Sequence, residues 1–347
     1  MHKTQFIDQL KEGDRLDDVF LVKTARLSET KAGKPYLILE VADKSGEIGG
    51  PIWEQAVEAQ AQCQVGAFVH LRGLVTSYQG KVQLKIDADG VRGVEQSGID
   101  LADFVAVCDQ DRAGLARDLQ ALVASVKNPF LKKLLQSFFK KEPMWLRFQE
   151  APAAKGIHHA YLGGLLEHSL SVARIADHLA THYPGVDRSL LLAGALLHDI
   201  GKVEELVLNV ALIDYTAPGR LKGHLVMGSE MVAVAAAQIK DFPPELLTQL
   251  QHLILSHHGR KEFGSPTVPM TVEAVLLSFV DDLDAKMNLM EQLRKKMKDS
   301  GLQWTEYQRS LERYLYLGPL ESSEPEAAPE VVDQQAGSIP ARQQTLF

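Results

Sequence analysis

Hydrophobic and polar positions alternate in short segments over residues 1–95, with turn residues between the segments. This alternation predicts strands at residues 19–27, 36–41, 48–53, 66–77 and 82–86, with a short helix at 54–62. Three strands, a helix and two strands is the element order of an OB-fold barrel. We therefore expect an N-terminal all-β domain of the kind that binds single strands.

From residue 115 the apolar positions recur every third or fourth residue, which is typical of helices. The expected helices cover residues 117–139 with a break at Pro129, then 162–182, 188–198, 229–239, 244–258 and 271–298. The whole stretch 115–317 looks helical. Residues 96–114 show neither the alternation of strands nor the three-and-four spacing of helices, and we interpret them as a linker.

The last residues, 319–347, are rich in Glu, Ala, Pro, Gln and Ser and predict a disordered tail. The expected fold is therefore a multidomain β-plus-α chain. It comprises an OB-fold barrel at 1–95, a linker at 96–114, an all-α domain at 115–318 and the tail.

Charge and composition exclude several classes of protein. The net charge of −8 argues against a protein that coats nucleic acid by neutralising phosphates. The two cysteines, Cys63 and Cys108, support neither a disulfide framework nor a cysteine zinc site. No apolar run approaches the ~20 residues that span a bilayer, and no signal peptide is visible. We expect a cytoplasmic protein without a membrane partner.

A metal site is indicated by histidines and carboxylates on the predicted helices. His198 and Asp199 follow the almost wholly apolar run 190–197. The other candidates are His168, His224, His257, His258, Asp281 and Asp282. A single buried histidine is better explained by hydrogen bonding in a core, but five together favour a site for a divalent cation such as Mn²⁺, Fe²⁺, Mg²⁺ or Zn²⁺.

Helix faces distinguish some of these candidates from their neighbours. His257 shares a stripe with Leu250, Leu253 and Ile254 and is expected to point inward, whereas His258 lies about 100° round the helix. The same test does not separate Asp281 from Asp282.

This pattern resembles the HD-domain phosphohydrolase superfamily. The matching segments are Glu-His at 167–168, His-Asp-Ile-Gly-Lys at 198–202, Gly-His at 223–224, Ser-His-His-Gly at 256–259 and Val-Asp-Asp-Leu-Asp-Ala at 280–285. The resemblance implies core metal ligands and a second metal position: His168, His198, Asp199 and Asp281 for the first, and His224 and His257 for the second. One or two divalent ions are expected, with Mn²⁺ as the choice.

A closer resemblance includes the N-terminal half. The barrel segment at 80–86 and the segment at 158–168 that leads into the first ligand helix resemble the YhaM-type 3′-to-5′ exoribonuclease family, over about residues 5–317. The implied activity is metal-dependent hydrolysis of phosphodiester bonds in single-stranded RNA, with DNA left open.

Two residues are expected to act in catalysis. Asp199 is the natural bridging ligand between two metals. Lys202, one turn beyond it, can stabilise charge on the equatorial phosphoryl oxygens, although an ordinary lysine at a helix end remains the alternative.

Substrate contacts are expected from both domains. His158 and His159 either contact the substrate phosphate or cap the ligand helix, and His258 is a further candidate for substrate binding. Tyr36, Trp53 and Tyr78 are candidates for base stacking, with burial in the barrel core as the alternative. Residues 1–95 hold 12 bases against 14 acids, so binding there should depend on stacking. The basic run at 294–298 is interpreted as a solvated helix end.

Two other functions remain open. One is an HD-type nucleotide or cyclic-dinucleotide phosphohydrolase that uses the same metals. The other is a single-stranded DNA-binding protein that docks on the sliding clamp, because Gln343, Leu346 and Phe347 resemble the Gln-x-x-Leu-Phe peptides of clamp-binding bacterial proteins. The sequence leaves open the choice between RNA and DNA and the formation of a homo-oligomer.

Overall fold

A computed structural model describes residues 3–78, 81–156, 159–209, 212–297 and 302–318. The chain divides into two compact units, Met1–Leu289 and Met290–Phe347. The predicted tail with Gln343, Leu346 and Phe347 lies outside the described residues, and so does His158. The domain boundaries expected from the sequence remain predictions.

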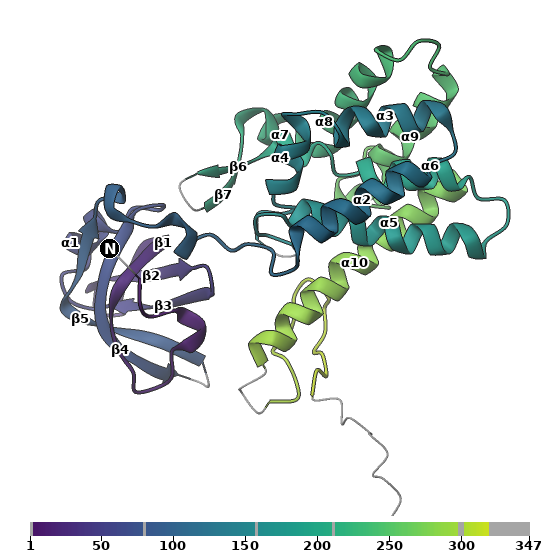
Figure 1. Cartoon of the computed structure of the whole chain (residues 1–347). Helices are drawn as coiled ribbons and strands as arrows, with labels where there is room; N and C mark the ends of the chain where they lie inside the picture. Colours follow the sequence, from purple (N-terminus) through teal and green to yellow (C-terminus); the bar gives the residue numbers. More distant parts are fainter. Residues whose placement is uncertain (1–2, 79–80, 157–158, 210–211, 298–301, 319–347) are drawn as a thin grey trace, which may run out of the picture. The chain divides into compact units, whose positions relative to one another are not determined.

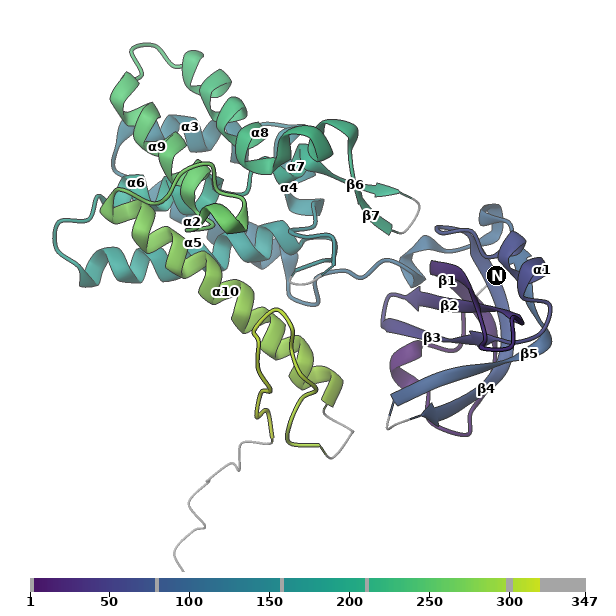
Figure 2. The same ribbon diagram turned by 180° about the vertical axis from the view of Figure 1, so that it is seen from behind.

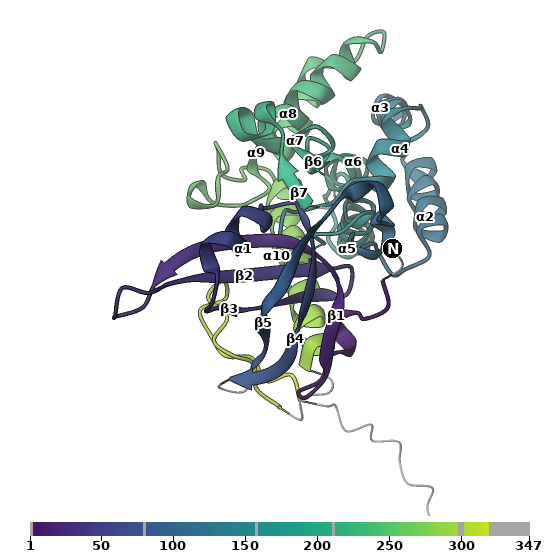
Figure 3. The same ribbon diagram turned by 90° about the vertical axis from the view of Figure 1, so that its left-hand side faces the viewer.

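The N-terminal part is an antiparallel sheet of five strands, drawn in purple and blue in Figure 3. Its elements are β1 (Arg15–Glu29), β2 (Pro35–Asp43), β3 (Gly46–Ile52), α1 (Ala56–Gln62), β4 (Phe68–Tyr78) and β5 (Lys81–Val94). The hydrogen-bonded order is β3-β2-β1-β4-β5. The predicted succession of three strands, a helix and two strands is confirmed, and the inward residues Phe20, Leu39 and Leu71 are fully buried.

A closed barrel is not confirmed, because β3 and β5 are the two edges of the sheet and share no ladder among the described residues. The edges nevertheless approach each other. A Cβ atom on Gly50 of β3 would lie 1.9 Å from the carbonyl oxygen of Leu84 in β5, so only glycine fits there. The sheet therefore curves until its edges meet without hydrogen-bonding along them.

The rest of the larger unit is mainly helical (Figures 1 and 2). Its helices are α2 (Arg112–Ser125), α3 (Pro129–Phe139), α4 (Met144–Glu150), α5 (Gly164–His182), α6 (Arg188–Leu197), α7 (Lys202–Glu205), α8 (Ala217–Ala237), α9 (Pro244–Ser256) and α10 (Val272–Met297), the last of which continues into the second unit. Short 3₁₀ helices occur at Ile7–Gln9, Gln96–Gly98, Leu101–Asp103 and Lys261–Phe263. All residues of α6 from Ser189 to Leu197 are buried, so this helix is the centre of the core.

The helix boundary at residue 129 has a local cause. Pro129 occupies the first turn of α3, and the side chain of Asn128 accepts hydrogen bonds from the backbone N–H groups of Phe130 and Leu131. Proline is tolerated at this position and asparagine is a favoured N-cap. The predicted pair of helices meeting at the proline is confirmed.

The expectation of helix throughout 115–317 is wrong in two places. Strands β6 (Leu206–Asn209) and β7 (Leu212–Tyr215) form a hairpin, because a short apolar run of Leu, Val and Ile fits a strand as well as a helix. Residues 302–318 form no helix either and are joined by isolated bridges. Helix α8 begins at Ala217, twelve residues before the expected start, and breaks at Gly223.

We find no helix among the described residues that is long and apolar enough to cross a membrane.

Candidate metal centre

Five helices bring the predicted metal ligands together at the centre of the helical part. The contributors are His168 on α5, His198 and Asp199 at the end of α6, His224 on α8, His257 and His258 at the end of α9, and Asp281 on α10. His168, His198, Asp199 and His257 are each at most 1% exposed. Because α6 is buried along its length, its end delivers His198 and Asp199 into the core rather than to the surface.

One group of ligand atoms surrounds His168. Its Nε2 atom lies 3.1 Å from Nε2 of His198 and 3.1 Å from Oδ1 of Asp281. Oδ2 of Asp199 lies 3.3 Å from Nε2 of His198. Two imidazoles and two carboxylates facing one point form a nitrogen and oxygen ligand set for a divalent cation.

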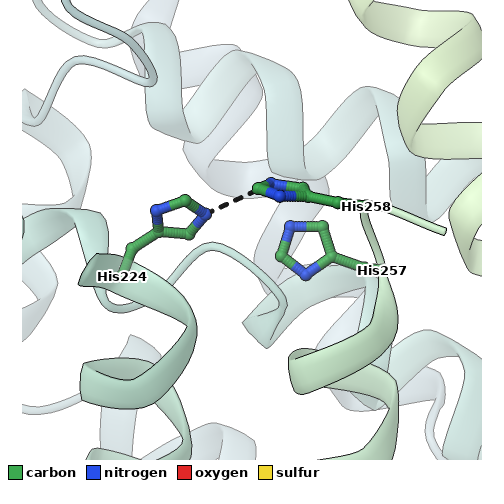
Figure 4. Close-up of side chains that lie close together, drawn as sticks. All are labelled: His224, His257 and His258. Atoms are coloured by element: carbon green, nitrogen blue, oxygen red, sulfur yellow. Dashed lines mark hydrogen bonds between the residues drawn. The ribbon is translucent and has the colours of Figure 1, made fainter. Parts of the chain in front are cut away.

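A second group faces the other oxygen of Asp199. Its Oδ1 atom lies 3.4 Å from Nε2 of His224 and 3.6 Å from Nε2 of His257. His258 joins this group, because its Nε2 atom lies 3.4 Å from Nε2 of His224 (Figure 4). The two oxygens of Asp199 thus face two different histidine groups.

His258, which was expected to bind substrate, lies beside the second ligand group. Helix α9 ends at Ser256, and His257 is its C-cap with backbone angles that are still helical. Nδ1 of His258 is fixed by the carbonyl oxygen of Phe263 at 2.9 Å, which turns Nε2 toward His224.

The histidines are oriented by hydrogen bonds on their far side. Nδ1 of His198 donates to the carbonyl of Ala195 and Nδ1 of His257 to the carbonyl of Ile254, both at 2.8 Å. A carbonyl only accepts, so Nδ1 carries a proton in both rings and Nε2 is the nitrogen that can face a metal when the ring is neutral. This is the arrangement that metal-binding histidines require.

Two carboxylates that the sequence did not single out orient the remaining rings. Oδ2 of Asp284 lies 2.7 Å from Nδ1 of His168, and Asp284 also accepts a hydrogen bond from Ser171. Oε1 of Glu205 lies 3.1 Å from Nδ1 of His224 and accepts the backbone N–H of His224. The second contact is possible because α8 breaks at Gly223, whose φ of 75° suits glycine.

Two buried polar atoms test whether a cation fits the centre. Oδ1 of Asp199 and Nε2 of His257 are buried and have no hydrogen-bond partner in the part of the chain that the structure describes. An unpaired buried polar atom costs free energy, on the order of 1–3 kcal/mol. Both atoms point at the second ligand group, and a cation there would satisfy both of them.

The pKa shifts favour metal-binding protonation states at Asp199, His257 and His258, but not at His198. Burial opposes ionisation of Asp199, but the charges of Lys202 and His198 hold its pKa well below the usual value. Burial lowers the pKa of His257 well below its usual value and lowers that of His258 as well. Burial also disfavours the charged ring of His198, yet the carboxylates of Asp199 and Asp281 raise its pKa to about 10. A metal ion would compete with the proton on that ring.

The structure separates the two aspartates that the helix-face test left equal. Asp281 faces His168, whereas Asp282 is exposed and pairs with Lys286 one turn along α10. Lys202 is buried and its Nζ atom donates to Oδ2 of Asp199 at 2.6 Å.

His159 is not placed to contact a substrate phosphate. It is buried, and its ring nitrogens face the hydroxyl of Tyr161 at 3.0 Å and Oδ2 of Asp284 at 3.1 Å. Asp284 in turn contacts His168. His159 therefore lies behind the ligand His168, where it supports the carboxylate that orients that ring.

The predicted stacking residues of the sheet fall into two cases. The rings of Tyr36 and Trp53 stack with centroids 4.8 Å apart and planes inclined by 27°. Trp53 is 59% exposed, so it does not belong to the core of the sheet. The side chain of Tyr78 lies outside the described part of the structure.

Comparison with known proteins places these residues in a family context. The HD domain family model matches residues 165–286, the range that contains all the ligand candidates. The chain is 34% identical to the 3′-5′ exoribonuclease YhaM of Bacillus subtilis (strain 168), over 88% of this chain and 96% of the relative. It is 36% identical to the protein of that name from Shouchella clausii (strain KSM-K16), over 82% and 88%. The corresponding protein from Geobacillus sp. (strain WCH70) is 33% identical over 90% and 94%.

Proposed function

The chain belongs to the YhaM family of 3′-to-5′ exoribonucleases, and from this premise we propose the part that each residue of the centre plays. It is a metal-dependent 3′-to-5′ exonuclease that acts on RNA. The proposals concern the metal ligands, the residue that acts on the phosphate and the surface that holds the strand.

We propose that the centre holds two divalent ions, with Mn²⁺ as the natural metal. His168, His198, Asp199 and Asp281 would hold the first, and Asp199, His224, His257 and His258 the second. The proposal is supported chiefly by the two unpartnered buried atoms, Oδ1 of Asp199 and Nε2 of His257. Bound ions of this kind supply Lewis acidity toward the phosphodiester and activate water. Mixed imidazole and carboxylate ligands suit Mn²⁺.

Lys202 is the proposed catalytic cation. Lys202 is buried, and its Nζ atom donates a 2.6 Å hydrogen bond to Asp199. Its positive charge therefore lies next to the carboxylate that belongs to both groups of metal ligands. A fixed ammonium in a buried site stabilises negative charge that develops on phosphoryl oxygens in the transition state. Asp199 would give one carboxylate oxygen to each of the two ligand groups.

The N-terminal sheet is the proposed OB-type module for single-stranded RNA. The stacked pair of half-buried Tyr36 and exposed Trp53 offers a ring surface to a base, and stacking of this kind tolerates any base. DNA is a second possible substrate, because stacking does not recognise the ribose. The clamp-docking peptide and a homo-oligomer remain predictions from the sequence.

Replacement of Asp199 tests the centre. Asp199→Ala should abolish the stepwise shortening of 5′-labelled single-stranded RNA in Mn²⁺, because it removes the ligand shared by both groups. Asp282→Ala, on the exposed face of α10, should behave as the wild type. Circular dichroism should show both variants folded. Retained activity in a folded Asp199→Ala protein would contradict the assignment.

The substrate class is tested in the same assay. Matched single-stranded RNA, single-stranded DNA and a cyclic dinucleotide should be hydrolysed with RNA preferred. Faster hydrolysis of the cyclic dinucleotide would favour a small-molecule phosphohydrolase instead.

A further inference from the structure

A hairpin follows α10 at residues 302–318, drawn in yellow-green in Figure 1. Bridges pair Trp304 with Tyr316 and Gln308 with Arg313. The backbone N–H of Thr305 donates to the carbonyl of Leu315 at 2.9 Å, and the N–H of Leu315 donates to the Thr305 hydroxyl at 3.0 Å. These bridges and hydrogen bonds join the two arms of the hairpin and fix their pairing.

The aromatic residues of the hairpin share one face. Trp304 contacts Tyr316 edge to face with centroids 5.2 Å apart, and Tyr307 contacts Tyr314 in the same way at 5.3 Å. Tyr314 and Tyr316 are two residues apart and so point to the same side of an extended strand. Leu315 between them is buried on the opposite side.

This distribution reverses the usual pattern, in which large rings are buried. Trp304, Tyr307, Tyr314 and Tyr316 are 49–61% exposed, whereas Thr305 and Leu315 are under 10% exposed. The four rings, which we call the aromatic face, are held in two pairs and present much of their surface outward. Exposed aromatic surface of this kind marks a binding site more often than a scaffold.

Local charge indicates the kind of partner. Residues 290–318 contain six bases and four acids, a net charge of +2 in a chain whose total is −8. Arg309 and Arg313 lie on the hairpin itself and are exposed, although the acidic Glu306 and Glu312 are exposed as well. The net charge of this segment is positive while that of the whole chain is negative, so the segment does not repel a polyanion as the chain as a whole does.

We propose that the aromatic face of Trp304, Tyr307, Tyr314 and Tyr316 binds single-stranded RNA by base stacking, with Arg309 and Arg313 close enough in sequence to reach its phosphates. Any base stacks on an aromatic ring, and arginine adds charge-assisted contacts to the backbone. The proposal rests on the proposed function, since an exonuclease must hold a strand of any sequence. The principal rival occupant is a second copy of the chain, which would bury the rings against protein.

The binding test uses the full-length protein with chelator, so that no hydrolysis occurs. Anisotropy of a labelled, unstructured RNA of about 15 nucleotides should give a dissociation constant that rises about tenfold in Trp304→Ala and severalfold in Tyr314→Ala. Trp304→Phe, which keeps a ring, should retain most of the affinity. Tyr183→Ala removes a similarly exposed ring at the end of α5 and should leave binding unchanged.

A second measurement separates strand binding from the metal centre. With Mn²⁺ present, bis(p-nitrophenyl) phosphate is a small diester without a strand to hold, and Trp304→Ala should hydrolyse it at the wild-type rate. Equal loss of RNA binding and diester hydrolysis would mean that the hairpin supports the fold, which overturns the proposal. Unchanged RNA affinity, with a lower mass by light scattering, would identify a second copy as the occupant and also overturn it.

The two proposals fail in different ways. If the wild type hydrolyses neither RNA nor the diester but Trp304→Ala still weakens RNA binding, the aromatic face is supported and the proposed catalytic function is wrong.

Discussion

The metal centre and the aromatic face use opposite means to hold their side chains. In the centre, rings such as His198 and His257 are fully buried and each is fixed by a hydrogen bond to a backbone carbonyl. In the aromatic face, rings such as Trp304 and Tyr316 are exposed and are held mainly by each other. Ligand geometry must be accurate to a fraction of an ångström, whereas a strand of any sequence needs only ring surface. Substitutions in the metal centre should therefore change metal affinity, and substitutions in the aromatic face should change RNA affinity, without one affecting the other.

The largest effect should come from the metal itself. Adding Mn²⁺ at about 100 times its dissociation constant should stabilise the folded protein by about 2.7 kcal/mol, because only the folded state assembles the ligands. Differential scanning calorimetry with and without chelator measures this as a rise in Tm. Asp199→Ala should remove the rise. A variant that keeps the full rise would show that the cation binds elsewhere.

The next effect tests the support behind His168. Asp284→Asn should weaken Mn²⁺ binding by about 10–100-fold, because the carboxylate that orients His168 loses its charge. Titration calorimetry of the metal gives the change directly. Asp282→Asn, two residues earlier and exposed, is the matched control and should not alter affinity. If the two variants changed Mn²⁺ affinity equally, Asp284 would have no special role in orienting His168.

A smaller effect is expected at the sheet. Trp53→Ala should weaken binding of single-stranded RNA by about 1 kcal/mol, the lower end of the range for a base stacked on an aromatic ring. Its Mn²⁺ affinity should stay at the wild-type value. If the sheet and the hairpin hold different nucleotides, the losses in Trp53→Ala and Trp304→Ala should add in the double variant. If Trp53→Ala lowered both the Mn²⁺ affinity and the RNA affinity, metal binding and strand binding would not be independent.

The smallest effect is expected at an exposed ion pair. The ammonium of Lys155 donates to Asp214 and lowers the pKa of that carboxyl from 3.8 to about 2. The pair therefore stabilises the fold above about pH 4, and the contribution is lost as the pH falls toward 2. Because both side chains are well exposed, Lys155→Ala should cost under about 1 kcal/mol at pH 6. Urea unfolding at pH 6 and pH 3 measures the difference, which should shrink at the lower pH.

Much of the candidate centre follows from the sequence, because its residues occupy helices with clear periodicity. His168, His198, Asp199, His224, His257 and Asp281 were all expected at the centre, and the structure brings them together. Their roles as ligands remain proposals. The order of strands and helices in the N-terminal half was predicted as well.

Other parts could not be predicted, for physical reasons. Asp281 and Asp282 were not separated because α10 also carries apolar residues on its exposed side, such as Phe279 and Leu283, so its pattern does not show which face is buried. Asp284 and Glu205 act through contacts with residues far away in the chain, which periodicity does not encode. The ring of His258 is turned toward His224 by a hydrogen bond to the carbonyl of Phe263, a contact that helix periodicity does not encode.

The hydrogen bonds behind the histidines also determine the order in which the centre assembles. His198 and His257 are oriented by carbonyls three residues earlier in their own helices, so each is ready as soon as its helix end has formed. His168 depends on Asp284, 116 residues later on α10. The orientation of His198 and His257 therefore needs no contact from α10, whereas that of His168 does. In hydrogen exchange, α10 is the helix whose protection should rise most when a cation fastens it to α5.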